Sequence, residues 1–273
     1  MFFRYIKDFF GYYFHRNKYW KQNFYVNFLT RICPKFKNTS QNPISSVIEI
    51  KQWVNKFSKF EKIIVCASGS SLNNLKKNSD KFLYITTNSS VSKVLDYHFI
   101  YFTFTREYIN VYLRHGFKNK GWEGTIFRFT QSKAYHKIRM SSYDKVLDYL
   151  SKYHRNKPEL LLSDIQKNSP EEANFNELNQ FIKSNLNFNF DNENSGISIL
   201  LLGYYFAKKL NKPLEVYGLD AGIHGEQYFN KSGHPGKEIS NEKTIKSLTH
   251  ILYGIQKDPS VPFSNHSYFK LDA

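Results

Sequence analysis

The chain has 273 residues, a formal net charge of +16 and two cysteines. This length can bury the core of one main domain with a smaller appendage, and it excludes an array of many domains. The two cysteines, Cys33 and Cys66, exclude a disulfide framework and favour a reducing compartment, and no Cys/His spacing resembles a structural zinc site. The positive charge predicts an anionic partner, such as a nucleic acid, an acidic membrane surface or a phosphorylated substrate.

Residues 1–45 are expected to form a basic, aromatic helical extension. Aromatic and aliphatic residues recur there at helical spacing, lysine and arginine lie between them, and Asp8 is the only acidic residue before residue 38. Charges interrupt every apolar run before the ~20 residues of a membrane span, which argues against a transmembrane helix or a signal peptide. The pattern favours an interfacial helix on an anionic inner-membrane surface, the alternative being a helix that packs on the main domain. We therefore expect a cytoplasmic protein that is peripheral on the inner membrane.

A polar stretch at residues 38–43 separates this extension from the main domain, residues 46–273. There, strand and helix patterns alternate with short connections, which predicts an α/β fold with a single Rossmann-like, doubly wound parallel sheet. Residues 132–192 have no decisive periodicity beyond two helical stretches. Apolar runs predict strands at residues 63–67, 82–87, 98–104, 125–129 and 213–220. Helical patterns cover residues 48–57, 72–77, 106–113, 143–149, 171–182, 195–207 and 241–255.

The segment at residues 62–72 passes from an apolar run directly into a turn of small residues. The run suits a parallel strand that is covered on both faces, and Gly69 tolerates the backbone angles of a sharp turn. Ser70 or Ser71 can cap a following helix, whose unpaired N–H groups would face a phosphate. The signal is weak alone, because the three spaced glycines of a dinucleotide fingerprint and the Gly-Lys-Ser/Thr ending of a P-loop are absent.

Polar residues follow several predicted strands, and ligands of parallel sheets bind at the carboxyl ends of the strands. Asp220 could accept hydrogen bonds from ribose hydroxyls, and Asn88 could donate its amide to a phosphate oxygen. Asn194, Ser195 and Gly196 precede a long helix and offer its free N–H groups to a phosphate. Each of these residues is also common in ordinary turns and helix caps. Ser68, Gly69 and Ser70 follow the first strand, and residues 103–105 follow the third.

Residues 221–236 are too rich in glycine for a regular element and are expected to form a mobile lid over a substrate. His224 and His234 lie in it, and imidazole suits general base catalysis near neutral pH, although most loop histidines are only solvated. The chain has no Asp-x-Asp pair of the kind that holds a divalent ion on a nucleotide diphosphate. Neither a metal nor another cofactor is therefore expected.

Taken in order, these segments resemble the bacterial sialyltransferases of glycosyltransferase family 42, the Campylobacter and Haemophilus lipooligosaccharide type. The resemblance covers roughly residues 62–256, with an unmatched stretch in the middle. It rests on residues 63–72, Asn88, residues 194–196, residues 217–220, Tyr228 and residues 232–234. It implies a GT-A-like variant of the fold, with Tyr228 donating its hydroxyl to the departing phosphate and His234 acting as the general base. The residues that would hold a CMP-activated donor are Ser68, Gly69, Ser70, Asn88, Ser195, Gly196 and Asp220.

The resemblance implies an inverting transfer of sialic acid, or a related keto-sugar, from CMP to a surface glycan such as lipooligosaccharide or capsule, by a homo-oligomer. The chain departs from the family where residues 191–193 replace an arginine and Gly222 replaces a second phosphate-binding tyrosine; His224 is a candidate substitute donor. Another nucleotide-sugar or pterin-phosphate transferase of the same fold stays open. A basic nucleic-acid-binding protein is a further alternative, which we do not favour because the basic residues are spread out and no binding module is recognised.

Overall fold

The computed structural model describes residues 48–76, 78–104, 121–129, 159–164, 167–190, 194–222 and 242–271. The expected N-terminal extension, the helices predicted at residues 106–113 and 143–149, and the expected lid beyond Gly222 lie outside these ranges. His224, Tyr228 and His234 lie outside them as well.

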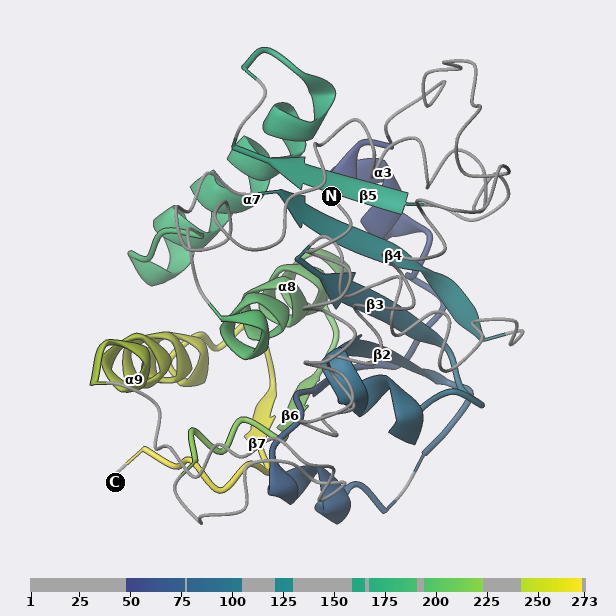
Figure 1. The fold of residues 1–273 in the computed structure, drawn as a ribbon, viewed down its shortest axis with the longest axis vertical. Helices are drawn as coiled ribbons and strands as arrows, with labels where there is room; N and C mark the ends of the chain where they lie inside the picture. The colour runs from purple at the N-terminus through teal and green to yellow at the C-terminus, as the bar shows by residue number, and fades with distance from the viewer. Residues whose placement is uncertain are drawn as a thin grey trace, which may run out of the picture.

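A seven-stranded parallel sheet forms the centre of the fold, in the order β5-β4-β3-β2-β1-β6-β7 (Figure 1). The chain enters the sheet at β1, adds strands outward to β5, and then returns to the other side of β1 with β6 and β7. This order confirms the predicted α/β, doubly wound parallel sheet. The strands are β1 (Lys62–Cys66), β2 (Phe82–Thr87), β3 (Phe99–Thr103), β4 (Trp122–Phe129), β5 (Glu159–Ser163), β6 (Leu214–Tyr217) and β7 (Phe263–Asn265).

Both faces of the central strands are buried, so their side chains alternate between two apolar cores. In β1, Ile63 and Val65 belong to one core, whereas Ile64 and Cys66 belong to the other. Strands covered on both faces have continuous apolar sequences, which explains why β2 occupies the predicted residues 82–87.

The α-helices of the described residues pack on one face of the sheet, and two 3-10 helices, η2 and η3, lie against the other. Helix α8 is apolar nearly all round and contacts β1, β2, β3 and β6. Gly203 permits this approach, because a Cβ atom there would lie 2.3 Å from Val65 Cγ2. The helices are α3 (Ile50–Asn55), α7 (Pro170–Leu186), α8 (Ser195–Leu210), α9 (Glu242–Gln256), η2 (Ser70–Asn74) and η3 (Asn88–Lys93). No helix within the described ranges has both the length and the apolar composition to cross a lipid bilayer.

The structure corrects the sequence prediction at three elements. Strand β5 lies inside the stretch that gave no decisive pattern, and β7 is a three-residue strand, too short for any periodicity. The α-helix predicted at residues 72–77 is instead the five-residue 3-10 helix η2. Its N-cap is Gly69, without a side-chain cap bond, so the expected capping by Ser70 or Ser71 is wrong.

Candidate functional site

A pocket of about 280 Å³ opens at the carboxyl ends of β1, β2 and β6, beside the N-terminus of α8 and the first turns of α9. The strand order reverses between β1 and β6, and ligands of doubly wound sheets bind at such a point. Among the predicted donor-binding residues, Ser70 does not line the pocket. Those that do are Ser68, Gly69, Asn88, Ser195, Gly196 and Asp220.

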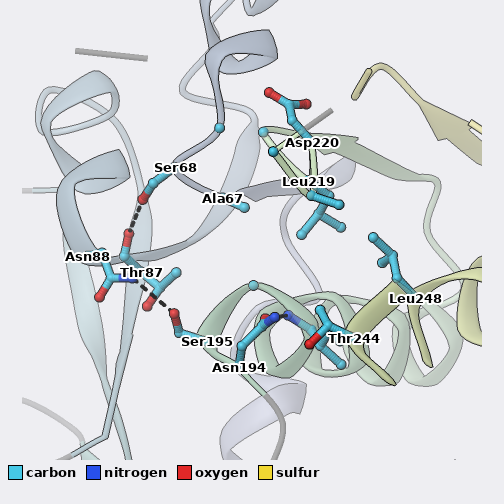
Figure 2. A pocket seen from close by; sticks show the side chains of 16 residues that line it. Ala67, Ser68, Thr87, Asn88, Asn194, Ser195, Leu219, Asp220, Thr244 and Leu248 are labelled. Atoms are coloured by element: carbon cyan, nitrogen blue, oxygen red, sulfur yellow. Dashed lines mark hydrogen bonds between the residues drawn. The ribbon is translucent and has the colours of Figure 1, made fainter. Parts of the chain in front are cut away.

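The N-terminus of α8 presents open hydrogen-bond donors to this pocket. Asn194 is the N-cap residue, and its Oδ1 accepts from the Ile197 N–H at 2.9 Å. Within the described residues, no acceptor contacts the backbone N–H of Ser195 or Gly196, as is usual for a first helical turn. Asn88 Nδ2 donates to Ser195 Oγ at 2.9 Å (Figure 2). Within the part of the chain that the structure describes, the Ser195 hydroxyl proton and the second Asn88 amide proton have no acceptor.

Thr87 adds a buried hydroxyl beside these donors. Its side chain is 1% exposed and lines the pocket. Oγ1 lies opposite the Ser90 N–H in the arrangement of a capping box, but the contact does not reach hydrogen-bond geometry, so the atom has no partner among the residues that the structure describes. Leaving a buried polar atom unpaired costs about 1–3 kcal/mol, and a bound ligand would remove that cost. From the sequence pattern, Thr87 is predicted only as the last residue of a strand.

The turn after β1 differs from the start of α8, because its hydrogen-bond donors already contact the Asp220 carboxylate. Asp220 Oδ2 accepts from the Ser71 N–H at 2.7 Å and from the Ser70 hydroxyl at 3.4 Å. Oδ1 accepts from the Ser71 hydroxyl and, at 2.9 Å, from the Tyr268 N–H. The side chain is 3% exposed and points away from Thr244 and Leu248 (Figure 2). Each oxygen already has two donors, so the expected contact with ribose hydroxyls finds no free lone pair.

Gly69 is needed for close packing and not for an unusual backbone conformation. Its φ is −67°, which other residues adopt readily, so the expected conformational reason is wrong. A Cβ atom at this position would lie 2.5 Å from Asp220 Oδ2 and 2.5 Å from the Gly218 carbonyl oxygen. Gly218 itself has a φ of +78°, and its carbonyl accepts from the Gly69 N–H at 2.9 Å. The loops after β1 and β6 therefore pack closely against each other at Gly69 and Gly218.

Two residues at the rim of the pocket have a left-handed backbone conformation. Asn88 and Ala221 have φ values of 52° and 50°, in the left-handed region. Asparagine tolerates this conformation, whereas alanine adopts it at a cost of roughly 1–2 kcal/mol. Strain of this kind is found most often at ligand sites, where the surrounding structure maintains it.

One wall of the pocket is apolar, and the buried Cys66 and Tyr217, at the ends of β1 and β6, do not line it. Leu219 and Leu248 form a wall opposite Asn88 (Figure 2). Burial raises the pKa of the Cys66 thiol well above its usual range, so this cysteine is not a nucleophile. Burial, followed by the neighbouring Glu215 carboxylate, likewise raises the pKa of Tyr217. Among the described residues, no group of three or more His, Cys, Asp or Glu side chains is placed to hold a metal ion.

Comparison with known proteins adds no relative: no family model, no curated protein and no solved structure matches this chain.

Proposed function

We propose that this protein is an inverting glycosyltransferase with a GT-A-like variant of the fold. It transfers sialic acid or a related keto-sugar from a CMP-activated donor to a surface glycan such as lipooligosaccharide or capsule. One observation carries the proposal: residues that follow β1, β2 and β6, and residues that begin α8, converge on one pocket where the strand order reverses. The choice of CMP and of the sugar rests on the resemblance to glycosyltransferase family 42.

The donor phosphate binds at the N-terminus of α8. The Ser195 and Gly196 N–H groups, the Ser195 hydroxyl and the second Asn88 amide proton are donors with no acceptor among the described residues. Thr87 contributes the unpaired hydroxyl. The aligned peptide dipoles of the helix add a partial positive charge at the same end. These neutral groups suit the single negative charge of a phosphodiester, which needs no divalent ion.

In the reaction, an acceptor hydroxyl attacks the anomeric carbon from the face opposite the phosphate. A glycosidic bond forms, the bond between the anomeric carbon and the phosphate oxygen breaks, and CMP leaves with that electron pair. His234 takes the acceptor proton and Tyr228 donates a hydrogen bond to the departing phosphate, roles that follow from the resemblance. The donors of α8 stabilise the charge that grows on the phosphate, an effect that commonly supplies several kcal/mol.

A matched pair of variants tests the phosphate position. Asn88→Asp places a carboxylate beside the phosphate, whereas Asn168→Asp makes the same change at an exposed position before α7, also at positive φ. We expect Asn88→Asp to weaken CMP binding about 100-fold, since like charges in contact cost several kcal/mol, and Asn168→Asp to leave it unchanged. Isothermal titration calorimetry measures both affinities. Equal affinities in the two variants would contradict this placement of the phosphate.

The activity itself is tested by CMP release from CMP-sialic acid and from CMP-octulosonic acid, each with and without glycan acceptors. No release from either donor would reject the transferase proposal, and salt-dependent binding of unrelated oligonucleotides would instead favour a nucleic-acid partner. We propose in addition that residues 1–45 bind an anionic inner-membrane surface. Co-sedimentation with anionic but not neutral vesicles is the expected result, and equal co-sedimentation with both would refute it.

A further inference from the structure

The turn after β1 binds an anionic group of the protein itself, the Asp220 carboxylate. In nucleotide-binding sheets, a glycine of this turn lets the backbone approach a pyrophosphate. Here the space beside Gly69 is filled by the Asp220 carboxylate, because a Cβ atom on Gly69 would lie 2.5 Å from Asp220 Oδ2. Asp220 thus stands where a phosphate would approach the turn.

The hydrogen bonds around Asp220 are those of an ionised carboxylate. Ser71 Oγ accepts from the Gly218 N–H at 2.9 Å, so its own proton is directed to Asp220 Oδ1. The Ser71 and Tyr268 N–H groups can only donate. These three contacts therefore all supply protons to the carboxylate, and the Ser70 hydroxyl, at 3.4 Å, can supply a fourth.

Three chain segments hold this carboxylate in place. They are the turn at Ser71, the loop after β6, and the segment after β7. The last is fixed to the second by the Ser267 hydroxyl, which is fully buried and accepts from the Leu219 N–H at 3.0 Å. Asp220 cannot turn away to admit a ligand without breaking bonds to two other segments.

The pocket therefore has two places where an anion could bind. The one at the N-terminus of α8 is open, whereas the one at the β1 turn is filled by the Asp220 carboxylate. We infer that Asp220 is a specificity-determining residue that limits the ligand to one phosphate. A second phosphate directed at the turn would meet a fixed carboxylate, and every N–H and hydroxyl that donates to Asp220 is already engaged. The pocket then binds nucleoside monophosphates and their esters in preference to nucleoside diphosphates. This inference rests on the proposed nucleotide-binding function.

The test compares the affinities of CMP, CDP and the monomethyl ester of CMP, which adds bulk to the phosphate without adding charge, for the wild-type protein, by calorimetry in EDTA so that no metal masks the charge. We expect CMP and the ester to bind within about threefold of each other, and CDP at least about tenfold more weakly. Asp220→Asn keeps the side-chain shape and removes the charge, so the CMP/CDP ratio should fall toward one through tighter binding of CDP.

The outcomes separate this inference from the proposed function. Equal binding of CMP and CDP by the wild type, or a folded Asp220→Asn variant with the wild-type ratio, would overturn the inference and leave the transferase proposal standing. Equally weak binding of the ester and CDP would also overturn the inference, because the pocket would then select ligands by the size of the phosphate substituent and not by its charge. If no cytidine nucleotide binds, the proposed function fails and the inference fails with it. Should Asp220→Asn not fold, the wild-type comparison of the ester with CDP decides.

Discussion

The turn after β1 and the start of α8 lie on the same pocket and combine serine with glycine, yet they present opposite chemistry. At α8 the first-turn N–H groups of Ser195 and Gly196 have no acceptor within the described residues. At the β1 turn the Ser71 N–H and hydroxyl are bound to Asp220, which lies 149 residues further along the chain. A local motif of small residues thus indicates where donors can gather. A distant residue decides whether they remain open to a ligand.

The largest expected difference in stability comes from replacing a glycine by alanine in each of the two regions. Gly69→Ala forces a Cβ atom to within 2.5 Å of the Gly218 backbone oxygen, whereas Gly196→Ala meets only side chains, Leu219 Cδ2 at 3.0 Å and Asn194 Oδ1 at 3.3 Å. We expect Gly69→Ala to lower the free energy of unfolding by about 3 kcal/mol or more, and Gly196→Ala by less than about 1 kcal/mol. Urea denaturation measures both. Similar losses would mean that the β1 turn is not the more tightly packed region.

Serine-to-alanine changes separate stability from binding. Ser71→Ala leaves the Gly218 N–H without its acceptor and removes one of the four donors to Asp220, all in a buried setting, and should cost about 2 kcal/mol. Ser195→Ala should change stability by less than about 0.5 kcal/mol, because its hydroxyl is only part-buried, but should weaken CMP binding about tenfold. Denaturation and calorimetry on both variants check this. A stable Ser71→Ala variant would show that the turn does not depend on Asp220.

The smallest expected change in stability comes from Thr87→Val, which nearly preserves shape and removes the unpaired hydroxyl. Because that hydroxyl has no partner in the free protein, the variant should be as stable as the wild type, or more stable by up to about 1 kcal/mol. CMP binding should fall about five- to tenfold, since the ligand loses one donor. A loss of stability without a loss of affinity would assign Thr87 to the start of η3 and not to the pocket.

Much of the fold was accessible from sequence because the sheet is buried on both faces. The continuous apolar runs of β1, β2, β3 and β6 are typical of parallel strands covered on both faces. Strand β7 could not be predicted in the same way, since three residues at the sheet edge carry no periodic signal. Its position matters for the site, because it brings the Tyr268 N–H to Asp220.

For the site, six of the seven residues predicted to bind the donor line the pocket, but the backbone reason given for Gly69 is wrong, and the predicted contact of Asp220 with ribose stays untested. Gly69 and Asp220 were expected to serve the ligand, one by backbone freedom and the other by contact with ribose. In the structure they pack against each other. Thr87 had no signal in the sequence, because whether a hydroxyl is satisfied depends on the packed environment and not on its neighbours in the chain. The roles proposed for Tyr228 and His234 stay predictions.

The contacts of Asp220 also bear on the order of folding. Its partners Ser71 and Tyr268 lie 149 residues before it and 48 residues after it, so both hydrogen bonds close long loops. Long-range contacts form late, because the entropy of loop closure opposes them until neighbouring structure is in place. The β1–β3 part of the sheet can therefore form while the pocket is still incomplete. Nucleotide affinity should consequently be among the last properties to appear during refolding, after the secondary structure has reached its native content.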